Sequence, residues 1–105
     1  MITLPNNYTK NGYNHEVIFR EKEYVISKLT SMETGHFICY EAFRVIVAKP
    51  FTLKGVFYEE REQTPSNEHW GKYGFSVHTL EKAHKRIEDL KQRAWKNGKK
   101  DLTQS

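Results

Sequence analysis

Apolar and polar residues alternate through much of the chain before residue 79, which is the period-two pattern of β-strands. Two runs rich in β-branched and aromatic residues, 16–20 and 23–30, are separated by charged residues and predict a first hairpin. The run 37–49 is apolar on both alternating faces, so it predicts a strand inside the sheet. Because few strands are this long, we expect a bend or bulge near 41–44.

Two glycine-containing pairs indicate further turns. The Lys-Gly pair at 54–55 lies between the apolar runs 51–53 and 56–58, and this pattern predicts a second compact hairpin. The Asn-Gly pair at 11–12 favours a tight turn within a polar N-terminal arm, 1–15. The sequence leaves open whether this arm forms a hairpin or frays.

The period changes to that of a helix after residue 78. Apolar residues then recur at steps of three and four, at Leu80, Ala83, Ile87, Leu90 and Ala94. This spacing predicts one amphipathic helix over 79–97, with Thr79 as its N-cap and a stop at Asn97-Gly98 before a frayed tail, 98–105. We therefore expect a single α+β domain: an antiparallel sheet of four to six strands, drawn from 16–78, with the C-terminal helix packed on one face.

The segment that joins the sheet region to the helix, 65–75, combines turn formers with large rings. Its Pro, Ser, Asn and Gly residues interrupt regular structure, whereas Trp70, Tyr73 and Phe75 need burial or a partner. This combination predicts an ordered connection, followed by a short aromatic strand over 73–77.

Length and cysteine content narrow the class of protein. A chain of 105 residues fits one domain that needs neither disulfides nor a structural metal. The single cysteine, Cys39, excludes an intramolecular disulfide, and its place in an apolar strand favours a small core residue over a nucleophile. The N-terminal residues lack the pattern of a signal peptide, and no apolar run reaches membrane-spanning length. We expect a cytoplasmic protein.

Charge is distributed unevenly along this small basic protein, whose formal net charge is +4. From Thr79 onward eight Lys or Arg face four acidic residues, whereas the chain before it is balanced at nine against nine. A local acidic block is formed by Glu59, Glu60, Glu62 and Glu68. Such a dipolar domain suits a nucleic acid at its basic end or a basic protein surface at its acidic block; a simply solvated surface is the alternative.

Residues that could carry catalysis are sparse. The one combination that could serve as a metal or acid-base site consists of His69, His78 and His84 with Glu68, Glu81 and Glu88. Their spacing matches no zinc motif, and the chain has neither a glycine-rich phosphate loop nor a nucleophile elbow. We therefore predict a protein that is not an enzyme and that holds no cofactor and no metal.

Binding residues are better represented. Trp70, Lys72 and Tyr73 interleave a cation with aromatic rings. The predicted helix adds basic residues at Lys82, Lys85, Arg86 and Arg93. Together these residues are suited to stacking on bases and neutralising a phosphate backbone. In the alternative interpretation the rings anchor the helix on the sheet and the lysines only increase solubility.

Several segments resemble small uncharacterised proteins of phages and integrative elements. They are YEAFRVI at 40–46, FTLKG at 51–55, PSNEHWG at 65–71 with YGF at 73–75, and LEKA at 80–83. The resemblance covers residues 17–90 and implies an inhibitor of host defence, including the anti-CRISPR class. Its partner would be a host protein or ribonucleoprotein complex, such as a CRISPR effector, in the cytoplasm of the infected or element-bearing cell.

Two binding hypotheses follow, ranked above a third, a small enzyme with an unrecognised site, and all three leave the oligomeric state open. In the first, a non-enzymatic inhibitor binds a host nucleoprotein complex, with Glu59, Glu60 and Glu62 on a basic protein surface or the basic helix on guide RNA. In the alternative, the chain is itself an RNA- or DNA-binding module that uses the basic helix and the interleaved rings.

Overall fold

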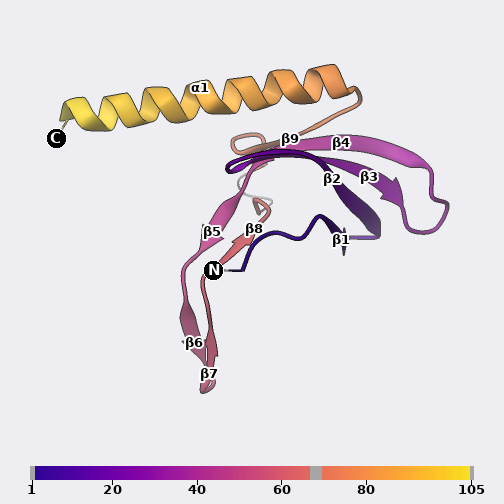
Figure 1. The fold of residues 1–105 in the computed structure, drawn as a ribbon, viewed down its shortest axis with the longest axis horizontal. Coiled ribbons are helices and arrows are strands. Elements are labelled where there is room, and N and C mark those ends of the chain that lie inside the picture. Colours follow the sequence, from indigo (N-terminus) through magenta and orange to yellow (C-terminus); the bar gives the residue numbers. More distant parts are fainter. Residues whose placement is uncertain (1, 67–69, 105) are drawn as a thin grey trace.

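Five strands form one antiparallel sheet, and a helix covers one of its faces (Figure 1). The computed structural model describes residues 2–66 and 70–104, with side chains described as far as Arg93. The strand order is β1-β2-β3-β4-β9. The elements are β1 (Asn7–Lys10), β2 (Tyr13–Glu21), β3 (Tyr24–Ser31), β4 (Phe37–Arg44), β9 (Gly74–Val77) and α1 (Leu80–Gln104). The predicted α+β architecture is confirmed, including the number of strands in the main sheet.

Tight turns join the first three strands. Asn11 and Gly12 have φ values of 54° and 85°, the positive values that a two-residue hairpin turn requires. Strand β1 therefore pairs with β2, so residues 7–15 belong to the sheet and do not form a frayed arm. The first predicted hairpin is confirmed as β2–β3, with Lys22 at a φ of 55° in its turn.

The long apolar run divides at Val45 into β4 and β5 (Ile46–Ala48). Strand β4 lies between β3 and β9, as expected for a strand that is apolar on both faces. The Val45 amide donates a hydrogen bond to the Glu23 carbonyl at 2.7 Å, and the Val45 side chain is buried. The interruption thus falls just after the predicted 41–44, where the chain leaves the main sheet.

A two-stranded arm projects from the sheet on the side away from α1 (Figure 1). Strand β5 pairs with β8 (Arg61–Gln63), and β6 (Phe51–Leu53) pairs with β7 (Val56–Tyr58). The second predicted hairpin is confirmed, with positive φ at Lys54 and Gly55. The radius of gyration is 15.5 Å, against about 13 Å for a compact chain of this length.

The N-terminal residues hold the base of this arm. Ile2 bridges to Arg61 in parallel, so β8 has a neighbour on both sides, β5 on one and the N-terminal segment on the other. The Leu4 amide donates to the Glu62 carboxylate at 2.9 Å, and the Arg20 guanidinium donates to it at 2.7 Å. These bonds, the one from Arg20 above all, hold the pKa of Glu62 below its usual value.

Buried apolar residues lie on both faces of the main sheet. On the face toward α1 the buried residues are Tyr24, Ile26, Ala42 and Val77, which pack against Ala83, Ile87 and Leu90 of the helix. On the opposite face they are Val25, Phe43 and Val45, which pack against Leu4, Val17 and Trp70. The predicted helical stripe is therefore confirmed at its three central positions. Leu80 is 42% exposed, and the side chain of Ala94 lies outside the described part.

The predicted N-terminus of α1 is confirmed, and its predicted C-terminus is wrong. The Thr79 hydroxyl accepts a hydrogen bond from the Lys82 amide at 3.2 Å, which confirms Thr79 as the N-cap. The predicted stop at Asn97-Gly98 is absent, because α1 continues to Gln104. A glycine inside a helix costs about 0.5–1 kcal/mol, which does not by itself end a helix.

Trp70 packs on β9 from the face opposite α1. Its ring lies directly over Gly74, where an added Cβ would overlap the ring atoms. Its indole N–H donates to the Ser76 hydroxyl at 3.3 Å. The connection that contains Trp70 is thus held on the sheet at its C-terminal part, while 67–69 lie outside the described residues.

Replacing Gly74 tests this close contact. We expect Gly74→Ala to lower the free energy of unfolding by about 1–3 kcal/mol, because the new methyl group displaces the Trp70 ring. Urea unfolding followed by circular dichroism measures the loss. In a Trp70→Leu background the same glycine substitution should cost much less; an equal cost in both backgrounds would show that the ring is not the obstacle.

Candidate nucleic-acid interface

Basic residues of α1 line one edge of the sheet. Lys85 and Arg86 lie three and four positions after Lys82, so the three residues share the side of the helix next to its apolar stripe. Together with Val77 and Asp89 they line a hollow of about 480 Å³. Strand β9, which contains Val77, pairs with β4 and is the last strand in the order of the sheet. The hollow therefore opens at a sheet edge and not inside the core.

Two arginines lie on the ring of Phe75, which β9 presents to the helix side. The guanidinium carbons of Arg86 and Arg93 are 4.5 Å and 5.5 Å from the ring centroid. Arg93 also donates a hydrogen bond to the carbonyl of Lys72 at 3.3 Å. These contacts restrict where the two charges can lie, so less side-chain entropy remains to be lost on binding an anion.

The ion pairs that α1 makes leave a net positive charge on the side of the helix that carries the hollow. Within the described residues, Lys82 and Lys85 make no ion pair, and Arg86 is 3.7 Å from Asp89 across an exposed turn. Lys91 is instead paired with Glu21 at 2.9 Å and Glu88 at 3.5 Å. The hollow thus contains three basic side chains and one acidic one, and the exposed pair neutralises little of their charge at a distance.

The loop before β9 extends this surface. Lys72 places its ammonium group 5.2 Å from the centre of the Tyr73 ring, and its carbonyl is held by Arg93. From Lys82 to Arg93 the helix rises about 16 Å, which is long enough to contact several successive phosphates. The structure therefore brings six of the predicted binding residues to one edge: Lys72, Tyr73, Lys82, Lys85, Arg86 and Arg93.

The remaining predicted binding residues lie elsewhere. Trp70 is on the opposite face of the sheet, over Gly74. Glu62 is occupied by Arg20 and the Leu4 amide at the base of the arm, whereas Glu59 is exposed and Glu60 is half-buried beside it. The acidic block is therefore divided between an internal bond network and the surface of the arm.

The histidines predicted as the one possible metal cluster do not converge where they are described. His84 packs edge-on against Phe19 at 4.8 Å between ring centres, while His69 and Glu68 lie outside the described residues. Among the residues that are described, no group of three His, Cys, Asp or Glu side chains is placed to hold a metal ion. Cys39 is buried as expected, and burial raises the pKa of its thiol.

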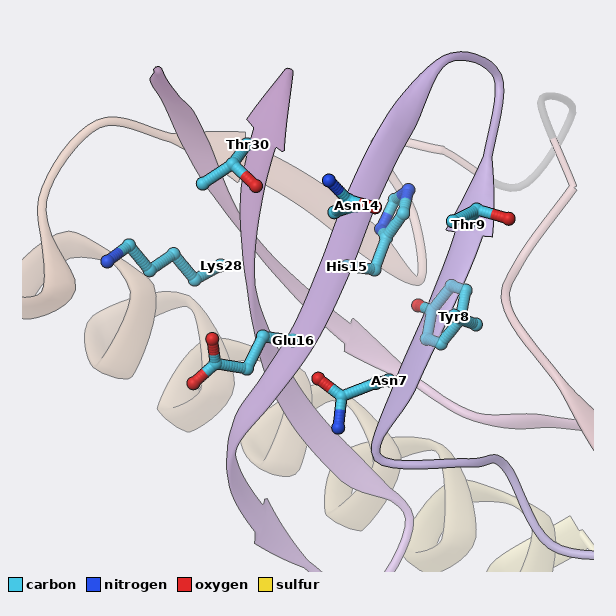
Figure 2. A pocket seen from close by; sticks show the side chains of 8 residues that line it. All are labelled: Asn7, Tyr8, Thr9, Asn14, His15, Glu16, Lys28 and Thr30. Carbon is cyan, nitrogen blue, oxygen red and sulfur yellow. The ribbon is translucent and has the colours of Figure 1, made fainter. Parts of the chain in front are cut away.

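Sequence reasoning missed a buried polar cluster on the face opposite α1. His15 is only 5% exposed, and its Nδ1 atom lies 3.4 Å from the Glu41 carboxylate. Tyr8 stacks on the His15 ring at 4.7 Å, and Figure 2 shows the two side chains next to each other on β1 and β2. Ser27 is fully buried nearby. The sequence carried one signal for this cluster: polar residues recur at inward-facing positions of strands that are otherwise apolar.

Burial disfavours the charged forms of the two ionisable groups in this cluster. Burial raises the pKa of Glu41 and lowers that of His15, so each group is pushed toward its neutral form. The hydroxyls of Tyr8 and Ser27 are buried without a well-formed hydrogen bond. Hollows of about 300 and 170 Å³ flank the pair, the first lined by polar residues of β1, β2 and β3 (Figure 2).

Removing the charge of Glu41 tests the electrostatics of the cluster. Because the folded-state pKa of Glu41 is raised, its ionised form costs stability at every pH above its ordinary value of 4.5. Glu41→Gln should therefore raise the melting temperature at pH 7 by about 2–5 °C, and the difference should disappear near pH 4. Glu16→Gln, an exposed position on β2, is the matched control. A lower melting temperature for Glu41→Gln at pH 7 would instead indicate a stabilising ion pair with His15.

No family model, no curated protein and no solved structure matches this chain. In the described part, α1 is neither apolar enough nor sufficiently free of charge to span a membrane. The assignment of a candidate interface to the α1–β9 edge therefore depends on its geometry and charge alone.

Proposed function

We propose that this protein is not an enzyme and that it binds nucleic acid through the basic edge formed by α1 and β9. The observation that carries the proposal is the convergence of Lys82, Lys85 and Arg86 on one hollow with a single acidic neighbour, Asp89. Basic residues gathered along one side of a helix are the electrostatic footprint of a protein that contacts a phosphate backbone. The excess charge of the chain lies in this same helix.

The contacts would be made mainly to the sugar-phosphate backbone of the nucleic acid. The two lysines carry mobile point charges that displace counterions from phosphates, which supplies affinity without reading sequence. Arg86 and Arg93 are held by the Phe75 ring and can present their planar N–H groups to phosphate oxygens. Tyr73, at the far end of the same edge, offers a half-buried ring next to which a base could stack.

The resemblance of residues 17–90 to phage proteins supports a narrower form of this proposal. In that form, the nucleic acid belongs to a host nucleoprotein defence complex such as a CRISPR effector, and binding inhibits the complex. Guide RNA presents the same phosphate groups as free RNA, so the basic edge serves both forms of the proposal.

Salt dependence tests the interface directly. We expect the protein to bind a fluorescent 20-nucleotide RNA or DNA strand, with log K falling linearly as log salt rises. The double variant Lys82→Ala/Lys85→Ala should reduce the magnitude of that slope by about 1.4, because each lost phosphate contact on a single strand contributes about 0.7. Fluorescence anisotropy between 50 and 300 mM NaCl measures both. Lys49→Ala, on the exposed part of the arm, is the control and should leave the slope unchanged.

Failure of the wild-type protein to bind either strand at 50 mM NaCl would contradict the proposal. The narrower form has a separate test, a pull-down from host lysate with and without nuclease treatment. A defined ribonucleoprotein retained by the wild-type protein, and lost in the Lys82→Ala/Lys85→Ala variant, would support it. Recovery of mixed nucleic acid alone would leave general binding and overturn the inhibitor form.

A further inference from the structure

A hollow of about 170 Å³ lies on the face of the main sheet opposite α1 and includes part of the buried polar cluster. Three adjacent strands contribute His15 of β2, Leu29 of β3 and Glu41 of β4, which the strand register places on one face. The hollow is further lined at the β1–β2 turn and by the connection between β8 and β9, through Lys10, Asn11, Thr64, Pro65 and Trp70. It therefore lies between the sheet and two connecting segments.

Two hydrogen-bond acceptors face each other in this hollow. Burial lowers the pKa of His15, so its ring is neutral at pH 7 and carries one N–H. The Nε2 atom lies 3.4 Å from the Lys10 carbonyl, which can only accept, so the ring proton belongs on Nε2. The Nδ1 atom is then an acceptor, 3.4 Å from the Glu41 carboxylate and without a hydrogen-bond donor in the described part of the chain. A donor that reaches both atoms would satisfy the pair.

The hollow also carries one charge of each sign. Its acidic group is Glu41, whose side chain is 19% exposed. Its basic group is Lys10, whose ammonium donates to the Thr64 hydroxyl at 2.8 Å and is thereby held at the connection before β9. Burial raises the pKa of Glu41 and the charge of Lys10 counteracts this rise, so the two groups lie within electrostatic reach of each other. Although both are in the described part of the chain, they form no ion pair with each other.

We propose that this hollow binds a small α-amino acid. The ammonium group of the ligand has three N–H donors, so it can donate to both the Glu41 carboxylate and Nδ1 of His15 while balancing the carboxylate charge. The carboxylate of the ligand accepts from the Lys10 ammonium. Pockets for drug-sized molecules measure about 300–1,000 Å³, so this smaller hollow admits only a short side chain such as that of alanine. Apolar neighbours for that side chain are Leu29, Pro65 and Trp70.

The two opposite charges make a zwitterion a better ligand than a simple ion. An amine without a carboxylate would bring a second positive charge next to Lys10, and an anion without an amine would meet Glu41. The site lies on the face of the sheet that α1 does not cover, apart from the basic edge. Binding of an amino acid is therefore independent of the proposed binding of nucleic acid.

Titration of the ¹⁵N-labelled protein at pH 7 tests the site, with L-alanine, ethylamine and propionate as probes. Ethylamine lacks the carboxylate of alanine, and propionate lacks its ammonium group. We expect L-alanine to shift the amide resonances of Asn11 and Thr64 and the indole resonance of Trp70, with a Kd on the order of 1 mM. Both analogues should bind at least about tenfold more weakly, because each leaves one charged group of the hollow without a partner.

Two variants and a matched control locate the binding. Glu41→Gln and Lys10→Met should each weaken L-alanine binding at least about tenfold. Glu16→Gln, on the other face of β2, should leave the affinity unchanged. Both test variants should fold, because Lys10 is exposed and the Glu41 substitution removes a charge whose burial is unfavourable. The dispersion of the same spectra checks this directly.

Absence of shifts with 50 mM L-alanine would overturn the proposal and leave water or a proton on Glu41 as the donor to Nδ1. Equal affinities for L-alanine and ethylamine would also overturn it, since the carboxylate would then contribute nothing. Unchanged L-alanine binding in both Glu41→Gln and Lys10→Met would place any binding outside this hollow.

Discussion

Burial of both faces of the β3–β4 pair is the constraint on which the rest of the structure depends. Val25 and Phe43 are fully buried on one face, and Ile26 is fully buried on the other. In a domain this small, each such side chain contributes about 1.5–3 kcal/mol when it leaves water. Each face therefore needs a cover: α1 supplies one, and Trp70 with the N-terminal segment supplies the other. The positions of these covering elements follow from the need to exclude water from the same two strands.

The place of the basic edge is a consequence of that packing. Because Ala83, Ile87 and Leu90 must face the sheet, the helical positions beside them are turned toward β9. Arg86 and Arg93 then lie on Phe75, a residue of the edge strand. The core and the candidate interface are thus two sides of one helix. A change that rotates the apolar stripe would also move the charges away from the sheet edge.

Much of the fold could be predicted from local patterns, and the parts that could not depend on contacts between distant residues. Period two and period 3.6 identified the β2–β3 and β6–β7 hairpins and the start of α1. They do not indicate where a hairpin lies in space, so neither the projecting arm nor the pairing of Ile2 with Arg61 was predictable. The end of α1 was also missed, since a single glycine is a weak signal against an otherwise helical sequence.

The candidate interface was likewise predictable from the sequence only in part. The basic residues could be predicted because their helical spacing places them on one side of α1. The face of the sheet on which Trp70 lies could not be predicted. Its ring fits over Gly74, whereas Phe75, the next residue of β9, points to the side of α1, because adjacent residues of a strand point to opposite sides. The cluster of His15 and Glu41 was missed because each residue alone resembles an ordinary surface residue; only the burial of both by β1 and the covering segments makes the pair unusual.

The pairing of β5 with β8 has a consequence for how the chain can fold and evolve. Strand β9 must find β4 across a long stretch of chain, with Gly74 pairing to Phe43. Since Ile46 pairs with Gln63, the arm closes most of that stretch through local turns, which shortens the loop that must close when β9 pairs with β4. The tip of the arm is thereby uncoupled from the closure of the sheet. Insertions or replacements at the 54–55 turn can change what the arm contacts while the distance that β4 and β9 must bridge stays the same.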